Sequence, residues 1–218
     1  MNTCHLAEPI TGETITTLRQ WATDYQLAIT GSYIACEESS VPDISSSYYN
    51  RAFFLTPEGD AHFYDKRHLF RMGSETEHFT AGNRRLIIPY RGWNILLLVC
   101  YDLRFPVWSR NVNNEYDLLI YVANWPVSRR KAWDILLQAR AIENMSYVCG
   151  VNRIGMDNNH FQHSGGSVIY SPKGELLAHV PDNEEGISTT ILELSVLTEF
   201  RKKFPIWKDA DVFTLFKS

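Results

Sequence analysis

The sequence has neither a long apolar run nor a basic stripe. No stretch approaches the ~20 uninterrupted apolar residues of a membrane-spanning helix, and the first residues lack the basic and apolar regions of a signal peptide. Lys and Arg number 21 against 25 Asp and Glu, which gives a net charge of −4. The short basic runs at 129–131 and 201–203 are typical of solvated helix faces. We therefore expect no membrane partner, no nucleic-acid partner and a cytoplasmic location.

Cysteine is also scarce, and its spacing excludes two further kinds of site. Cys4, Cys36, Cys100 and Cys149 lie far apart, with no C-x-x-C pair among them. That spacing argues against a zinc site and against a disulfide framework. We expect four free thiols and no metal or other cofactor. By default each thiol is a small buried hydrophobe.

The sequence does contain the pattern of one α/β domain. An apolar fraction of 44% over 218 residues suffices for a sizeable core. Apolar periodicity and turn residues predict helices at 14–25, 105–114, 128–145 and 195–203 and strands at 27–36, 51–66 (interrupted by a turn), 93–100, 116–125, 146–154, 166–180 (a hairpin) and 186–194. The polar segments at 37–47 and 67–85 are expected to be loops. This order predicts a layered α/β sandwich with two sheets.

Three of these predictions name particular residues or faces. The helix at 14–25 should bury one face, made of Ile15, Leu18, Trp21, Ala22 and Tyr25. The helix at 128–145 should begin with Ser128 as its N-cap. The strand at 27–36 is nearly continuous in apolar residues, which is typical of strands covered on both faces.

Cys100 ends the apolar run WNILLLVC and opens a polar turn that leads into a short helix. The positive end of a helix dipole favours a thiolate, and ligands bind at the carboxyl ends of strands in α/β sheets. A nucleophile is one interpretation of Cys100, and the last core residue of the strand is the other. Position alone leaves both open.

A cysteine nucleophile needs a base and a group that holds the developing oxyanion. Lys66 ends the strand AHFYDK and is a candidate for the second task, although an exposed strand-terminal lysine explains it equally well. His160 and His163 follow Cys100 in the order of a papain-like pair, but they lie in a polar loop. Thiol redox chemistry would need a resolving cysteine, and none is evident.

Eight segments, in a fixed order along nearly the whole chain, form a pattern that is specific to one family. They are YDKRHLF (64–70), TAGNRR (80–85), LLLVCYDLRFPVWSRN (96–111), YVANWP (121–126), ARAIEN (139–144), VNRIG (151–155), SPKGE (171–175) and EFRKKFPIWKDADVF (199–213). Together they resemble the carbon-nitrogen hydrolase (nitrilase) superfamily, and more narrowly its bacterial omega-amidase branch. The K-x-H-L-F and C-Y-D-L-R-F-P segments carry most of the likeness.

The resemblance implies a four-layer α-β-β-α sandwich that forms a homodimer through its helices. It also implies an amidase without a cofactor, acting on a small-molecule amide such as 2-oxoglutaramate to give 2-oxoglutarate and ammonia. In the family a cysteine attacks the amide carbonyl, ammonia leaves, and water hydrolyses the thioester. Cys100 matches that nucleophile, while Lys66 and the backbone N–H of Tyr101 match the groups that hold the oxyanion.

A second family glutamate lies in the loop after the lysine and hydrogen-bonds it. Glu75 is the match by its register with the following Ala-Gly, and Glu77 is the alternative. Either residue is also explained as a solvated loop acid.

The resemblance further implies that Asn124 and Trp125 line the substrate pocket, where a plain strand-end turn is the other interpretation. An anionic substrate would need a basic group in that pocket. The arginines available for it are Arg104, Arg129 and Arg153, and the sequence does not choose among them.

The family's general-base glutamate follows an early strand, in a Pro-Glu pair, and it has no good match in this chain. Glu8 precedes a proline and follows no strand, and Glu13 stands where a helix N-terminus favours an acid anyway. We therefore expect one carbon-nitrogen hydrolase domain, 1–218, that lacks the family's first strand-helix-strand unit. A catalytically inactive fragment is the alternative to an active amidase. The strand edge left open at 27–36 predicts reduced stability or self-association.

Overall fold

The computed structural model describes residues 3–37 and 46–214. The chain divides into two compact units, Met1–Leu86 and Ile87–Ser218, each with its own sheet. Most of the loop expected at 37–47 lies outside the described residues. None of the helices in the described ranges is long and apolar enough to span a bilayer.

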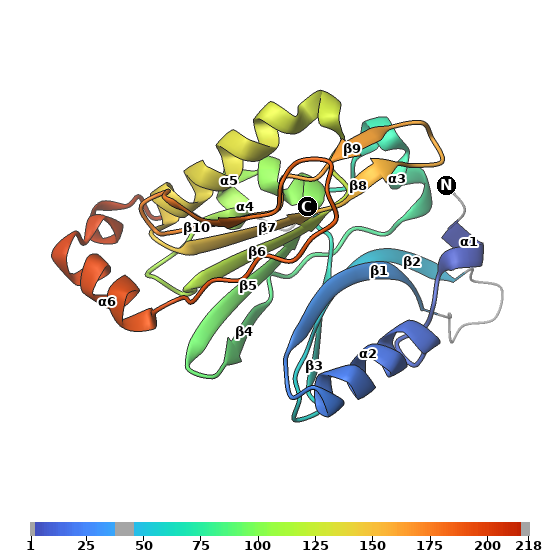
Figure 1. The fold of residues 1–218 in the computed structure, drawn as a ribbon, viewed down its shortest axis with the longest axis horizontal. Coiled ribbons are helices and arrows are strands. Elements are labelled where there is room, and N and C mark those ends of the chain that lie inside the picture. The colour runs from blue at the N-terminus through green and yellow to red at the C-terminus, as the bar shows by residue number, and fades with distance from the viewer. Residues whose placement is uncertain (1–2, 38–45, 215–218) are drawn as a thin grey trace. The chain divides into compact units, whose positions relative to one another are not determined.

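The first unit carries a three-stranded antiparallel sheet in the order β1-β2-β3. Its elements are α1 (Thr3–Leu6), α2 (Glu13–Asp24), β1 (Ile29–Glu37), β2 (Ser47–Leu55), β3 (Ala61–Asp65), the 3-10 helix η1 (Arg71–Gly73) and α3 (Glu75–His78). In Figure 1, α2 runs alongside this sheet. The helix expected at 14–25 and the strand-turn-strand expected at 51–66 are confirmed, and 67–85 is irregular apart from two short helices.

α2 packs on the sheet through a narrower face than the one its sequence predicts. Ile15 and Ala22 are fully buried in a cluster with apolar side chains of β2, and Leu18 packs against them. Trp21 and Tyr25 were expected on the same face but are 49% and 70% exposed. At about 100° of rotation per residue, Trp21 falls to one side of the line through the buried residues, and Tyr25 lies past the end of the helix at Asp24. The prediction for them is therefore wrong.

Glu8 fixes the start of α2. Its carboxylate accepts hydrogen bonds from the N–H of Thr14 at 2.8 Å and from the Thr14 hydroxyl at 2.6 Å. These bonds favour the charged form, so they lower the pKa of Glu8. This side chain therefore serves the helix terminus, in line with the sequence argument against it as a general base.

β1 is an edge strand of the sheet, as expected for 27–36. Within the described residues its outer edge pairs at a single bridge, where the N–H of Glu8 donates to Ile34 and the N–H of Cys36 donates to Glu8, both at 3.0 Å. Ala35 is the one fully buried residue of β1, so the strand is not covered on both faces, and that prediction is wrong. The effect of the open edge on stability and self-association stays a prediction.

The second unit is built on a six-stranded sheet in the order β11-β10-β7-β6-β5-β4. The strands of this unit are β4 (Ile87–Tyr90), β5 (Trp93–Val99), β6 (Leu118–Ala123), β7 (Tyr147–Asn152), β8 (Ile154–Met156), β9 (Gln162–Ser164), β10 (Val168–Tyr170) and β11 (Leu176–His179). β5, β6 and β7 run parallel, and the flanking strands pair antiparallel. The strands expected in the middle of the chain and the 166–180 hairpin are confirmed, whereas β4 and the β8–β9 hairpin were not predicted.

The helices of the second unit connect and cover this sheet. They are η2 (Cys100–Arg104), α4 (Pro106–Ser109), η3 (Val127–Arg129), α5 (Arg130–Asn144), α6 (Leu194–Lys203) and η4 (Ile206–Asp209). In Figure 1, α5 lies along the face of the sheet. A Cβ at Gly150 of β7 would overlap with Leu137 and stand 2.9 Å from Trp133, so a larger residue there would force these buried side chains to shift.

Two sequence predictions in this unit need correction. α5 has Arg129 and not Ser128 as its N-cap, because Ser128 is taken up in η3, which closes with a bond from the N–H of Arg129 to Pro126. The second is the strand expected at 186–194, where the structure has no strand and leaves Ile187 96% exposed.

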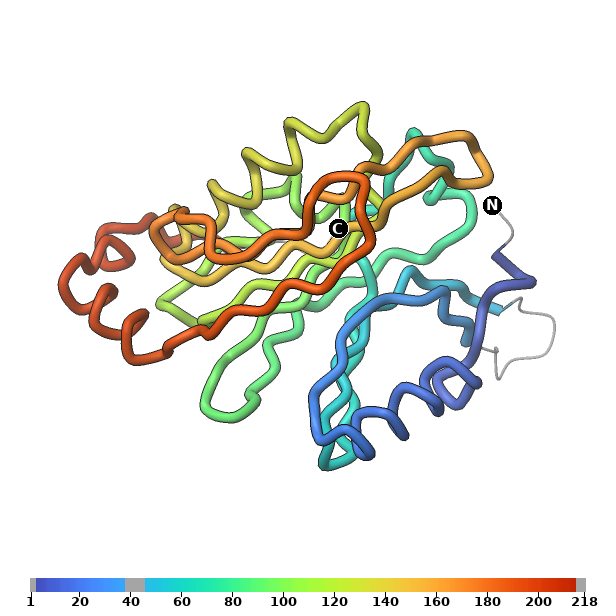
Figure 2. The backbone as a smooth tube through the Cα atoms, in the orientation of Figure 1, coloured from blue at the N-terminus to red at the C-terminus, as the bar shows by residue number. Residues whose placement is uncertain are grey.

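The segment 186–194 fails as a strand for lack of a partner. Figure 2 shows it as an extended stretch that leads into α6. A strand is stable only through ladder hydrogen bonds to a neighbour, and within the described residues no strand pairs with this segment. An alternating pattern therefore does not suffice to make a strand. The basic helix that follows, expected at 195–203, is confirmed as α6.

Candidate active site

Cys100 follows the last residue of β5 and opens η2 with a φ of +46°. Non-glycine residues are uncommon in this left-handed region, and such backbone strain clusters at functional sites. Because β5 pairs in parallel with β6, Cys100 stands at the carboxyl end of parallel strands, where α/β sheets bind ligands. The backbone thus places the thiol beyond the strand and outside its hydrogen-bond ladder.

Two buried charged residues hold the turn that Cys100 opens. Asp102 is fully buried, and its carboxylate accepts the N–H of Val99 at 3.1 Å. Arg140 of α5 is also buried and donates from Nη2 to the carbonyl of Leu103 at 2.7 Å. Hydrogen bonds to charged groups are stronger than neutral ones, so these contacts stiffen the turn.

The end of the next parallel strand lies beside Cys100. The Cys100 thiol donates to the carbonyl of Asn124, just after β6, with 3.8 Å between sulfur and oxygen. The next residue, Trp125, is held by Asn152 of β7, whose Oδ1 accepts the N–H of Trp125 at 2.7 Å and whose Nδ2 donates to its carbonyl at 3.0 Å. Asn152 also donates to Gly165 at 2.7 Å. Sequence reasoning missed this residue, although it lies in the segment VNRIG.

Lys66 belongs to the first unit and directly follows β3. Its N–H donates to Asn50 at 3.0 Å, which extends the pairing with β2 by one residue. Its side chain is 1% exposed, and its Nζ lies 2.5 Å from Oε2 of Glu75. The interpretation of Lys66 as an exposed strand-terminal lysine is therefore wrong. A buried ammonium needs such a partner because an unpaired buried charge is costly.

Glu75, and not Glu77, is the acid that binds Lys66. Glu75 begins α3, and its Oε2 also accepts the N–H of Phe70 at 2.6 Å while Oε1 accepts from Asn50 Nδ2 at 3.4 Å. Glu77 is exposed. One carboxylate therefore ties the irregular segment to the lysine, and the interpretation of Glu75 as a solvated loop acid is wrong.

Comparison with known proteins shows the family of this chain. A family model described as carbon-nitrogen hydrolase matches residues 2–202. The chain belongs to the carbon-nitrogen hydrolase family. It is 52% identical over 170 residues to the omega-amidase YafV of Escherichia coli K12, covering 78% of this chain and 66% of that protein. It is 34% identical over 167 residues to the 2-oxoglutaramate amidase of Bacillus subtilis 168, covering 76% and 64%.

A solved structure gives the same result for the fold of this carbon-nitrogen hydrolase. A superfamily protein from Xanthomonas campestris, with an arsenic adduct in its active site, has a TM-score of 0.90 at 39% identity and covers 96% of this chain and 79% of its own. The two matches to named amidases span just under two thirds of those proteins. The family resemblance and the mixed α/β fold are confirmed. The four-layer stacking, the single domain and the lacking first unit stay predictions.

The histidines of this carbon-nitrogen hydrolase do not support papain-like chemistry. His163 lies on β9, is 2% exposed, and has its Nδ1 3.3 Å from the carbonyl of Gly155 on the facing strand. His160 is exposed in the turn of the same hairpin, with a φ of +62°. The His163 side chain is therefore engaged within the β8–β9 hairpin, and His160 lies in its exposed turn.

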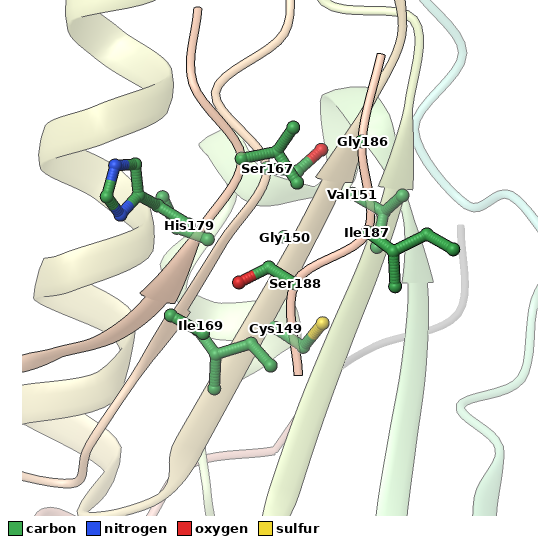
Figure 3. A pocket seen from close by; sticks show the side chains of 12 residues that line it. Cys149, Gly150, Val151, Ser167, Ile169, His179, Gly186, Ile187 and Ser188 are labelled. Carbon is green, nitrogen blue, oxygen red and sulfur yellow. The ribbon is translucent and has the colours of Figure 1, made fainter. Parts of the chain in front are cut away.

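A pocket of about 260 Å³ lies in the second unit of the protein, and none of the site residues expected from the sequence lines it. Its walls come from β7, β10, β11 and the segment Gly186–Ser188 (Figure 3). Cys149 of β7 lines this pocket, and burial raises the pKa of its thiol to about 11. Because a thiol with such a pKa stays protonated at neutral pH, Cys149 is a poor nucleophile.

Proposed function

We propose that this protein is an amidase of the omega-amidase type, which hydrolyses a small linear amide through a thioester on Cys100. The observation that carries the proposal is the turn at Cys100, where a member of the carbon-nitrogen hydrolase family holds a thiol in a left-handed conformation past a parallel strand. In the proposed reaction the thiol of Cys100 gives up its proton and the thiolate attacks the amide carbonyl. The C–N bond then breaks, and the nitrogen takes up that proton and leaves as ammonia. Water then attacks the thioester and releases the carboxylic acid.

Two groups stabilise the negative oxygen that forms in each attack. The N–H of Tyr101, the residue after Cys100 in η2, is a backbone donor of the kind that oxyanion holes use. The buried ammonium of Lys66 supplies a positive charge, and its ion pair with Glu75 holds that charge in one place. Such preorganised charges cost no rearrangement at the moment of reaction, which is why they lower the barrier.

The proposed substrate is 2-oxoglutaramate, with Asn124 and Trp125 lining its site. Support comes from the two relatives, one named an omega-amidase and the other a 2-oxoglutaramate amidase. The products are 2-oxoglutarate and ammonia. We further propose that the enzyme is a homodimer and acts in the cytoplasm.

The reaction also needs a base that takes the thiol proton and later activates water. Several acids of the first unit are engaged in local contacts: Glu8 binds Thr14, and both Glu37 and Asp65 bind Arg51 at 2.6 Å. These carboxylates fit the task of a base poorly. That observation favours, as a second candidate, a protein that keeps the hydrolase fold and binds the amide without turning it over.

Ammonia release from 2-oxoglutaramate by the full chain separates the two candidates. The amidase proposal predicts release that Cys100→Ala abolishes and that Cys149→Ala retains. No release by a chain with a cooperative thermal unfolding transition supports the second candidate. Release that persists in a folded Cys100→Ala variant contradicts a thioester on this residue.

A further inference from the structure

Arg104 is the last residue of η2, four residues after Cys100. Its guanidinium carbon lies 5.3 Å from the centroid of the Trp125 ring. The side chain is exposed, and within the described part of the chain it makes no ion pair or hydrogen bond. The N–H groups of this guanidinium are therefore open to a ligand.

The ring under Arg104 is a rigid support. Trp125 is 3% exposed, and its indole Nε1 donates to the carbonyl of Arg129 at 2.8 Å. Its backbone is held on both sides by Asn152, and its ring contacts Trp133 with 5.5 Å between centroids. A cation over this ring is attracted by the ring face and keeps its hydrogen-bond donors.

The geometry of stacking decides what Arg104 can bind. A guanidinium over an aromatic ring covers one face, while its five N–H donors point outward in the plane of the group. That edge matches the two oxygens of a carboxylate in a paired hydrogen bond. Arg153, by contrast, directs its Nε and Nη2 to the carbonyls of Ile154 and Met156 in its own hairpin, at 3.1 and 3.3 Å.

The place of Arg104 fits a substrate that carries an amide at one end and a carboxylate at the other. Four residues of a 3-10 helix rise by about 8 Å, so the guanidinium is tied to the same short turn as the thiol. The ring beneath it follows Asn124, whose carbonyl meets the Cys100 thiol. Arg104 and the ring that supports it are therefore attached to the two turns next to the thiol.

We propose that Arg104, stacked on Trp125, binds the carboxylate of the substrate and selects amides of dicarboxylic acids over neutral amides. The proposal rests on the proposed amidase function for its kinetic consequences, but carboxylate binding by itself does not need turnover. It assigns this task to Arg104, one of the three arginines that the sequence left open.

A pair of substrates tests this selection. Succinamate and butyramide have the same chain length and differ in a terminal carboxylate against a methyl group. We expect Arg104→Gln to lower kcat/KM for succinamate roughly 10- to 100-fold, mostly through KM, because a hydrogen-bonded charge pair is lost. Butyramide should change by less than about threefold. Arg104→Lys should keep part of the selectivity, and Arg153→Gln is the matched control that should keep all of it.

Equal losses on both amides, or no loss with Arg104→Gln, would overturn the proposal, since a merely structural residue affects both substrates alike. Calorimetric binding of 2-oxoglutarate separates this failure from failure of the amidase function. We expect wild-type protein and Arg153→Gln to bind 2-oxoglutarate and Arg104→Gln to bind it at least about tenfold more weakly, whether or not the chain releases ammonia. Equal binding by Arg104→Gln and wild type, or no binding by wild type, would overturn the assignment of Arg104.

Discussion

Cys100 and Cys149 belong to the same six-stranded sheet but to different parts of it. Cys149 lies inside β7, paired on one side with β6 and on the other with β10, and burial raises the pKa of its thiol to about 11. Cys100 lies one residue past the end of β5, in a left-handed turn that two buried charges hold. The same side chain is a packing group inside the ladder and a candidate nucleophile just beyond it. Position relative to the strand end therefore separates the two thiols.

Replacing each thiol by a hydroxyl should give the largest difference between the two positions. Cys100→Ser should lower kcat for amide hydrolysis on the order of 10⁴-fold, because a serine hydroxyl without a matched base is a far weaker nucleophile. Cys149→Ser should stay within about threefold of wild type. Steady-state ammonia release gives both numbers. Comparable losses in the two variants would remove the distinction between the two positions.

The pair of Lys66 and Glu75 offers the next largest effect, because the proposal gives Cys100 a charged helper that Cys149 lacks. Glu75→Gln leaves a lysine side chain that is 1% exposed without its counter-charge. We expect the free energy of unfolding to fall by about 3–5 kcal/mol, measured by urea denaturation. Glu77→Gln, on the exposed neighbour, is the matched control and should change it by less than about 0.5 kcal/mol. Equal effects would show that the ion pair does not matter.

The pH dependence of stability probes Cys149 itself. In the unfolded chain its thiol ionises near its ordinary pKa of 9.0, whereas in the folded protein it stays protonated to about pH 11. The folded state therefore holds more protons between these values, and stability is lost as the pH rises from 9 toward 11. A pKa difference of this size corresponds to a loss of roughly 2–3 kcal/mol in the free energy of unfolding once the pH exceeds both values. Urea denaturation at pH 8 and pH 10.5 should show a smaller loss for Cys149→Ala than for wild type, and identical losses would contradict a buried thiol.

The smallest expected effect concerns the turn that holds Cys100. Asp102→Asn keeps an oxygen acceptor for the N–H of Val99 but removes the charge. The free energy of unfolding should therefore fall by about 1 kcal/mol. Because the turn positions the thiol, kcat should fall roughly tenfold with KM unchanged. Asp60→Asn changes an exposed residue of the turn between β2 and β3 in the same way and should alter neither quantity. A change in KM with kcat retained would assign Asp102 to substrate binding instead.

The long apolar strands could be predicted from the sequence because a run of consecutive apolar residues by itself indicates a buried strand. The runs that became β5, β6 and β7 are apolar almost throughout, and burial of such runs needs little information from elsewhere in the chain. Because the run expected as a strand at 93–100 ends with Cys100, the sequence also predicted this residue at a strand end. The segment 186–194 has a similar pattern but no partner strand among the described residues, and pairing is a property that no local pattern contains.

The details of the site depend on backbone conformations that could not be predicted from the sequence. Nothing in the residue type of Cys100 signals a positive φ, since that region favours glycine and asparagine. Glu75 and Glu77 are equivalent as letters, and the choice between them follows from the short helices that turn Glu75 toward Lys66 and the N–H of Phe70. The importance of Arg104 likewise comes from its stacking on Trp125, which only the fold reveals.

The central claim is that Cys100 carries the acyl group during amide hydrolysis. Acid quenching of the protein during turnover, followed by peptide mass spectrometry, tests it directly. We predict that the peptide containing Cys100 gains the mass of the acyl group, and that the peptide containing Cys149 is unchanged. Ammonia release without an acyl group on Cys100, or with one on another residue, would contradict the account.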